Sequence, residues 1–313
     1  MSAPTLFSSY ATPVIDPERG HRLRFYSAAV LAIAFILAIA LYGADYYVLG
    51  AADRPFSPKH VLLRPSGAIG IKLGILGVVL FLVIFLYPLR KRVPWLARIG
   101  KSKHWLDFHV IVGATAPVVI AFHSSFKFHG IAGIAFWIML AVALSGFIGR
   151  YIYAQIPRSL DMAEVSMKEL DQLQQDLTTD LSTQRMISPA DLQWVARIPT
   201  VDQVRGMPLY RALLLMIVLD LLRPFHVAHL RRRALGWSGA LLSLGGLLRS
   251  DNEELEFVVR TARHKSSLSK RIAFLSRTQQ VFHLWHVVHR PFSYSFAVLA
   301  LIHIGVALSL GYI

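Results

Sequence analysis

Four histidines with one repeated spacing are the residues best suited to chemistry in this chain. His109 and His123 are separated by fourteen residues inside an apolar stretch, and His289 and His303 repeat that separation inside another. At about 100° and 1.5 Å per residue, fourteen helical steps return to nearly the same face about 21 Å further along. A neutral imidazole is a common axial ligand of haem iron. The spacing therefore predicts two helices that each present two iron ligands on one face.

The same spacing predicts which histidines pair. If the two helices are parallel, His109 lies level with His289 and His123 lies level with His303. The prediction is two b-type haems, each held non-covalently between two histidines. His286 stays open as an alternative to His289, although its seventeen-residue separation from His303 leaves a rotation mismatch of about 100°.

Neighbouring residues suggest further contacts to the cofactors. Gly113 follows His109 by one turn, and a residue that small would let a porphyrin lie against the helix. Arg290 and Lys103 are candidate partners for haem propionates on the cytoplasmic side, and Lys127 is a candidate on the outer side. If His286 is not a ligand, it could contact a propionate or a quinone, which is a possible further cofactor.

The composition indicates a membrane protein with basic connecting segments. Of the 313 residues, 55% are hydrophobic and 16% are charged, and the net charge is +15. In a soluble chain that charge would suggest nucleic acid as a partner, but here it lies between the apolar runs, so we expect a lipid partner and no nucleic acid. The absence of cysteine excludes thiolate-held iron–sulfur clusters and covalently attached haem.

Five stretches are long and apolar enough to cross a bilayer as helices. They are residues 25–49, 67–88, 105–127, 131–154 and 281–312. Lysine and arginine concentrate in the segments that an odd number of crossings places on one face, which the positive-inside rule makes cytoplasmic. We therefore expect a multi-pass protein of a bacterial inner membrane, with the N-terminus inside and the C-terminus outside.

The predicted fold is an all-α membrane helix bundle with a helical cytoplasmic insertion. Its parts are a cytoplasmic tail at 1–24, four spans within 25–156, an insertion at 157–278 and a fifth span at 279–313. The insertion contains short apolar runs within 209–248, which we expect to lie at the membrane surface. Whether this part enters the membrane stays open.

The remaining polar residues contain no Ser–His–Asp set, no paired carboxylates within a span and no H-E-x-x-H zinc-protease pattern. His21 and His60 are expected at the surface, and His104 is expected to be solvated at the interface. We expect almost no acidic side chains inside the spans, which disfavours proton pumping through carboxylates.

The two histidine segments resemble the transmembrane haem domain of ferric reductases, NADPH oxidases and related bacterial cytochrome b subunits. The similar phrases are HWLDFHVIVGATAPVVIAFH at 104–123 and FHLWHVVHRPFSYSFAVLALIH at 282–303, and the resemblance covers about 150 of the 313 residues. It implies a dihaem cytochrome b that moves electrons across the bilayer. Flavin-containing members of that group continue into a domain for FAD and NADPH, and no dinucleotide fingerprint occurs here.

An electron donor would therefore be a separate molecule. We expect the subunit of a membrane oxidoreductase complex, with a soluble flavoprotein or iron–sulfur protein docking on the basic cytoplasmic face. Two other classes stay open: a stand-alone quinone or metal reductase, and a transition-metal transporter that uses the histidines as a pathway. The sequence does not determine the donor, the acceptor, the direction of electron flow or the oligomeric state.

Overall fold

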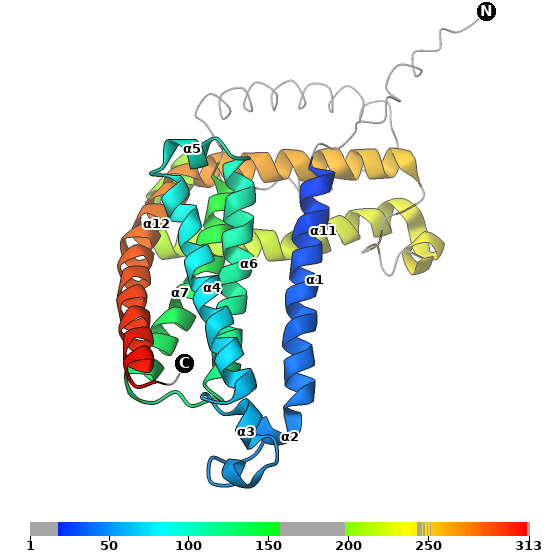
Figure 1. Ribbon diagram of the computed structural model, residues 1–313. Helices are drawn as coiled ribbons and strands as arrows, with labels where there is room; N and C mark the ends of the chain where they lie inside the picture. The colour runs from blue at the N-terminus through cyan, green and yellow to red at the C-terminus, as the bar shows by residue number, and fades with distance from the viewer. Residues whose placement is uncertain are drawn as a thin grey trace, which may run out of the picture. The chain divides into compact units, whose positions relative to one another are not determined.

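The computed structural model describes residues 18–156, 198–242, 246, 248, 250 and 252–311. The chain divides into two compact units, one formed by Met1–Phe147 with His289–Ile313 and the other by Ile148–Val288. Every described element is a helix (Figure 1). The all-α prediction is therefore confirmed for this part of the chain.

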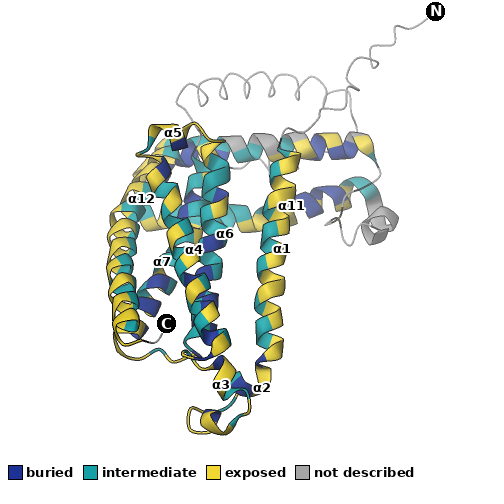
Figure 2. Cartoon of the chain, viewed as in Figure 1, coloured by how far each residue is buried: buried dark blue, intermediate teal, exposed yellow. Residues whose placement is uncertain are grey.

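The first unit is a bundle of long apolar helices. Its long helices are α1 (Arg19–Tyr42), α4 (Ala68–Arg90), α6 (Ser102–His123), most of α7 (Gly130–Gln155) and the end of α12 (Glu253–Ser309). Its short elements are α2 (Ala44–Tyr47), η1 (Arg54–Phe56), α3 (His60–Leu63) and α5 (Pro94–Ala97). Most apolar side chains of α1 face outward, and none of its residues is buried (Figure 2). Outward apolar surface on a long helix is what a lipid environment accommodates.

Among the residues that the structure describes, six helices are long and apolar enough to cross a membrane, one more than the sequence predicts. The additional candidate is Leu209–Leu235, which the sequence predicts at the membrane surface. The first span also differs, because its helix covers Arg19–Tyr42 and not 25–49. The hydropathy continues past residue 42, but the chain turns at Gly43, where a Cβ atom would lie 2.4 Å from the Tyr47 ring.

Small residues bring α4 and α6 together. Along α4, Gly70, Gly74 and Gly77 recur at helical spacing. A Cβ at Gly74 would lie 2.8 Å from the ring of His123, and a Cβ at Gly77 would lie 2.2 Å from Ile120. The absence of side chains at Gly74 and Gly77 therefore lets α6 approach α4 closely and places His123 against it.

One buried guanidinium group closes the turns at each end of this bundle. Arg90 donates hydrogen bonds to the carbonyl oxygens of Ala97 and Gly100 in the connection from α4 to α6. Arg54 donates to the carbonyl oxygens of Leu49 and Ser125, which joins the connection after α1 to the end of α6. A guanidinium group can donate to several carbonyl oxygens at once, so each arginine ties together the segments at one end of α6.

The second unit consists of α10 (Val201–Gly206), α11 (Leu209–Leu242), the first part of α12 and the end of α7. Two ion pairs join α11 to α12, and the one between Arg231 and Glu256 is buried. Arg231 donates two hydrogen bonds of 2.8 Å to the carboxylate of Glu256, and Lys270 donates to Asp220. The predicted insertion at 157–278 is thus mainly helical where it is described. Its residues 157–197, 243–245, 247, 249 and 251 lie outside the described part, as do residues 1–17 of the predicted tail.

Candidate haem-binding site

The structure holds both histidines of α6 in one defined tautomer. The Nδ1 atom of His109 lies 3.0 Å from the carbonyl oxygen of Ile84, and that of His123 lies 2.8 Å from the carbonyl oxygen of Gly70. A carbonyl oxygen only accepts, so each Nδ1 carries the proton and donates it. Each Nε2 then keeps its lone pair. Metal-binding histidines commonly have this arrangement, in which a backbone carbonyl orients the ring through its second nitrogen.

A different partner holds the imidazole of His289 in the same tautomer. Its Nδ1 atom lies 2.7 Å from the hydroxyl oxygen of Ser145 on α7. That hydroxyl donates its own proton to the carbonyl oxygen of Val142 at 2.8 Å. The hydroxyl oxygen is therefore available as an acceptor for the Nδ1–H group, which again leaves Nε2 of His289 with a lone pair.

Contacts with α4 determine the direction of the two histidine helices in the first unit. His109 near the start of α6 contacts Ile84 late in α4, so α6 is antiparallel to α4. The end of α12 follows the same rule: Arg290 is electrostatically coupled to Lys91 just after α4, and the rings of Phe296 and Phe81 are 5.6 Å apart. The final section of α12 is therefore parallel to α6, as the pairing of the histidines requires.

A cavity of about 530 Å³ lies between α4, α6, α7 and the end of α12, and both His123 and His303 line it. That volume falls in the range of ordinary ligand pockets, about 300–1,000 Å³. Most of its wall is apolar. The lining includes Ile71, Val78, Phe81, Ile84, Ala116, Ile120, Phe136, Met139, Phe296, Ala300 and Ile304.

The cavity matches the needs of a haem at this position. Two imidazoles reach it from different helices, its body is apolar, and His123 presents an unprotonated Nε2. Such residues could supply two axial ligands and exclude water from a porphyrin face. The structure thus brings the predicted outer pair to one site.

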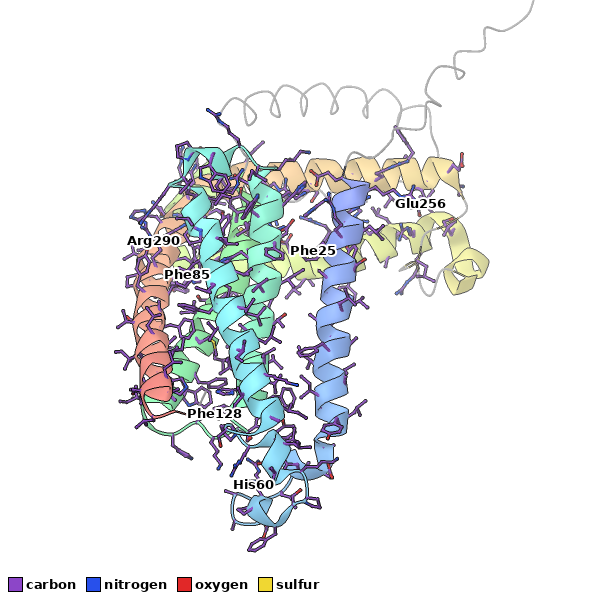
Figure 3. All side chains as sticks on the ribbon, viewed as in Figure 1. Phe25, His60, Phe85, Phe128, Glu256 and Arg290 are labelled. Carbon is purple, nitrogen blue, oxygen red and sulfur yellow. The ribbon has the colours of Figure 1, made fainter. Side chains whose placement is uncertain are left out.

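The predicted inner pair shares a level of the bundle. The Lys91 side chain is electrostatically coupled both to His109 and to Arg290, which directly follows His289. The ring of Tyr87 lies 5.2 Å from the ring of His109. His109 and His289 therefore lie near the last turn of α4, whereas His123 lies near its first turns (Figure 3, where Arg290 is labelled).

The other predicted contact residues occupy varied positions. Gly113 has no atom within 4 Å of the place where a Cβ would be, so its face of α6 is open. Arg290 is exposed, and Lys103 donates a 2.6 Å hydrogen bond to the carboxylate of Glu18. His286 belongs to the second unit, where its Nδ1 lies 3.1 Å from the carbonyl oxygen of Phe282. The choice between His286 and His289 as a ligand remains a prediction.

Sequence reasoning missed a polar cluster at the start of α6. Asp107 is buried and accepts a 3.0 Å hydrogen bond from Nε2 of His21 on α1, and the ring of His21 stacks on His104 at 3.6 Å. The surface placement of His21 was therefore wrong, and an acidic side chain does lie within a span. The signal was present, because a charged residue two positions before His109 in an apolar run is unusual.

Glu18 extends this polar cluster beyond the first span. Its carboxylate accepts hydrogen bonds from Lys103 and Lys101. These bonds, chiefly that from Lys103, lower the pKa of Glu18 to about 2. Glu18 is therefore ionised at neutral pH and offsets part of the positive charge around it.

Within the described ranges, no group of three or more His, Cys, Asp or Glu side chains is arranged to hold a metal ion. The row His283, His286 and His289 is included in that finding. No family model, curated protein or solved structure matches the chain.

Proposed function

We propose that this protein is a membrane electron-transfer subunit, a cytochrome b, that carries two bis-histidine b-type haems. The observation that carries the proposal is the cavity of about 530 Å³ that His123 and His303 line from parallel helices. The Nδ1–H group of His123 donates to the carbonyl oxygen of Gly70, so its Nε2 atom keeps the lone pair that a metal would bind. The same tautomer at His109 and His289 supports a second site about 21 Å away along the helices.

In this proposal each haem, when bound, takes up and releases one electron at its iron. The chain's residues hold the imidazoles in fixed orientations and keep water away from the macrocycle. Each imidazole is kept from rotating by the hydrogen bond at its Nδ1, because rotation would break that bond. The acceptors are the hydroxyl of Ser145 and the carbonyl groups of Gly70 and Ile84. The apolar wall lowers the local dielectric and so tunes the reduction potential.

The parallel direction of α6 and the end of α12 supports the topology with the N-terminus inside. If α6 crosses outward and α7 returns, the end of α12 must cross outward again. A single crossing by Leu209–Leu235 between them would reverse that direction. We therefore place this sixth apolar helix on the cytoplasmic side, in agreement with the ion pair between its Asp220 and Lys270.

The second unit supplies a basic surface for a redox partner. Exposed arginines lie on its α11 and α12 helices, namely Arg232, Arg233, Arg260, Arg263 and Arg271. In the proposed topology this surface faces the cytoplasm, where it would attract an acidic flavoprotein or iron–sulfur protein.

Purification of the full chain in detergent tests the proposal. We expect a red protein with two extractable haems per chain and the split absorption bands of reduced bis-histidine haem. His123→Ala is expected to remove about one haem, and His289→Ala is expected to remove the other. A folded preparation without porphyrin refutes the function, and loss of both haems from each variant refutes the pairing.

A further inference from the structure

The cavity that His123 and His303 line, called the outer cavity from here on, has its polar residues at one end. His60 belongs to α3, Arg64 and Ser66 lie between α3 and α4, and Ser124 and Lys127 directly follow α6. All of them border the end of the bundle where α4 begins and α6 ends. Figure 3 shows His60 and Phe128, both of which line the cavity, at that end, whereas Phe85 and Arg290 lie toward the opposite end.

The charge at this end has one sign. Arg64 and Lys127 line the cavity, and its lining contains no aspartate or glutamate. Their side chains are exposed, and within the part of the chain that the structure describes neither forms an ion pair with a carboxylate. Two cations at the end of an apolar pocket favour a ligand with an apolar body and an anionic edge.

The imidazole of His60, also at this end, is positioned by the buried Tyr46. The hydroxyl group of Tyr46, which is fully buried, lies 3.2 Å from Nδ1 of His60. That contact orients the His60 ring and leaves its Nε2 for a ligand. The sequence predicts a surface position for His60, whereas the structure makes it part of the cavity wall.

We propose that Arg64 and Lys127, assisted by His60, form a carboxylate-binding site that holds the propionates of the outer haem. This inference rests on the proposed function and adds the orientation of the cofactor. The reverse orientation would place two carboxylates against apolar residues such as Phe81, Ile84 and Met139. Burial of unpaired charge is costly, so the cationic end selects the direction in which the propionates point.

The first experiment uses wild-type protein alone. The apoprotein is reconstituted with haem b or with haem b dimethyl ester, which has no carboxylate, and release to a haem scavenger is measured. Charge-assisted hydrogen bonds of ordinary strength predict that the ester leaves the outer site about ten to one hundred times faster. Equal release rates for the two cofactors would overturn the inference while leaving the haem function intact.

The second experiment compares Arg64→Gln/Lys127→Gln with a matched control. Lys72→Gln removes an exposed lysine of α4 that does not line the cavity. The double variant should release haem b as fast as wild type releases the ester, and it should no longer discriminate between the two. Lys72→Gln should behave as wild type does.

The outcomes separate this inference from the function it rests on. If wild-type protein binds no haem, the proposed function fails. If the double variant keeps slow haem release but loses electron transfer to an added anionic acceptor such as ferric citrate, the cations serve a free anion and the propionate assignment is wrong. Retained discrimination against the ester in the double variant would also overturn it.

Discussion

Replacement of Gly74 by alanine should weaken the outer haem site without unfolding the protein. The new Cβ would lie 2.8 Å from Cε1 and 2.9 Å from Nδ1 of His123, whereas ordinary contacts begin at 3.4 Å. The imidazole is the far end of a rotatable side chain, so the ring can retreat while the helices stay in place. The fold therefore tolerates the change, and its main effect is a displaced His123 ring.

The expected magnitude follows from that displacement. The ring must move by about 0.6 Å, which exceeds the tolerance of about 0.5 Å within which functional groups must be held. Overpacking of this kind costs about 1–3 kcal/mol. At 1.4 kcal/mol per tenfold change, haem binding at the outer site should weaken by roughly 5- to 150-fold.

The assay is a haem titration of the apoprotein, with thermal unfolding of the apoprotein as a check on the fold. Gly146→Ala on α7 is the matched control, because no atom lies within 4 Å of a Cβ at that position. The reasoning is refuted if Gly74→Ala binds two haems as tightly as wild type does, or if the lost haem is the one that depends on His289.

Three further predictions test other contacts of the first unit. Ser145→Ala removes the acceptor for Nδ1 of His289 and should weaken the inner haem by about 10- to 100-fold in a haem titration, and loss of the outer haem instead would contradict the assignment. Asp107→Asn removes a buried charge that pairs with His21 and should destabilise the apoprotein by about 1–3 kcal/mol in chemical unfolding, whereas an unchanged midpoint would show that the pair contributes nothing. Because the folded-state pKa of Glu18 is lowered to about 2 from 4.5, its ion pairs should stabilise the protein above pH 4.5 and lose that effect as the pH falls toward 2. Unfolding midpoints of wild type and Glu18→Gln should therefore differ at pH 6 and converge at low pH, and a constant difference would refute this origin.

The sequence was sufficient for properties that depend on one helix at a time. Long apolar runs predicted helices, and the recovered bounds Ala68–Arg90 and Gly130–Gln155 are close to the predicted spans. The fourteen-residue histidine spacing is likewise a local property, because the geometry of a single helix places both side chains on one face. The histidine ligands and the haems themselves remain predictions.

Properties that depend on contacts between segments required the tertiary structure. Hydropathy did not show that the first helix ends at Tyr42, because the turn at Gly43 lies against Leu63 of α3, whose Cδ1 would be 3.1 Å from a Cβ at Gly43. It also placed His21 and His60 at the surface, since their partners Asp107 and Tyr46 lie on other elements.

The outer cavity also depends on contacts between segments that lie far apart in the chain. The spacing of His123 and His303 on their own helices predicts that they can meet, but the space between them is created by packing among four helices. Local periodicity determines which face a side chain occupies. Only the packing of distant segments determines what that face meets, because such contacts join residues far apart in the chain, and no single helix specifies them.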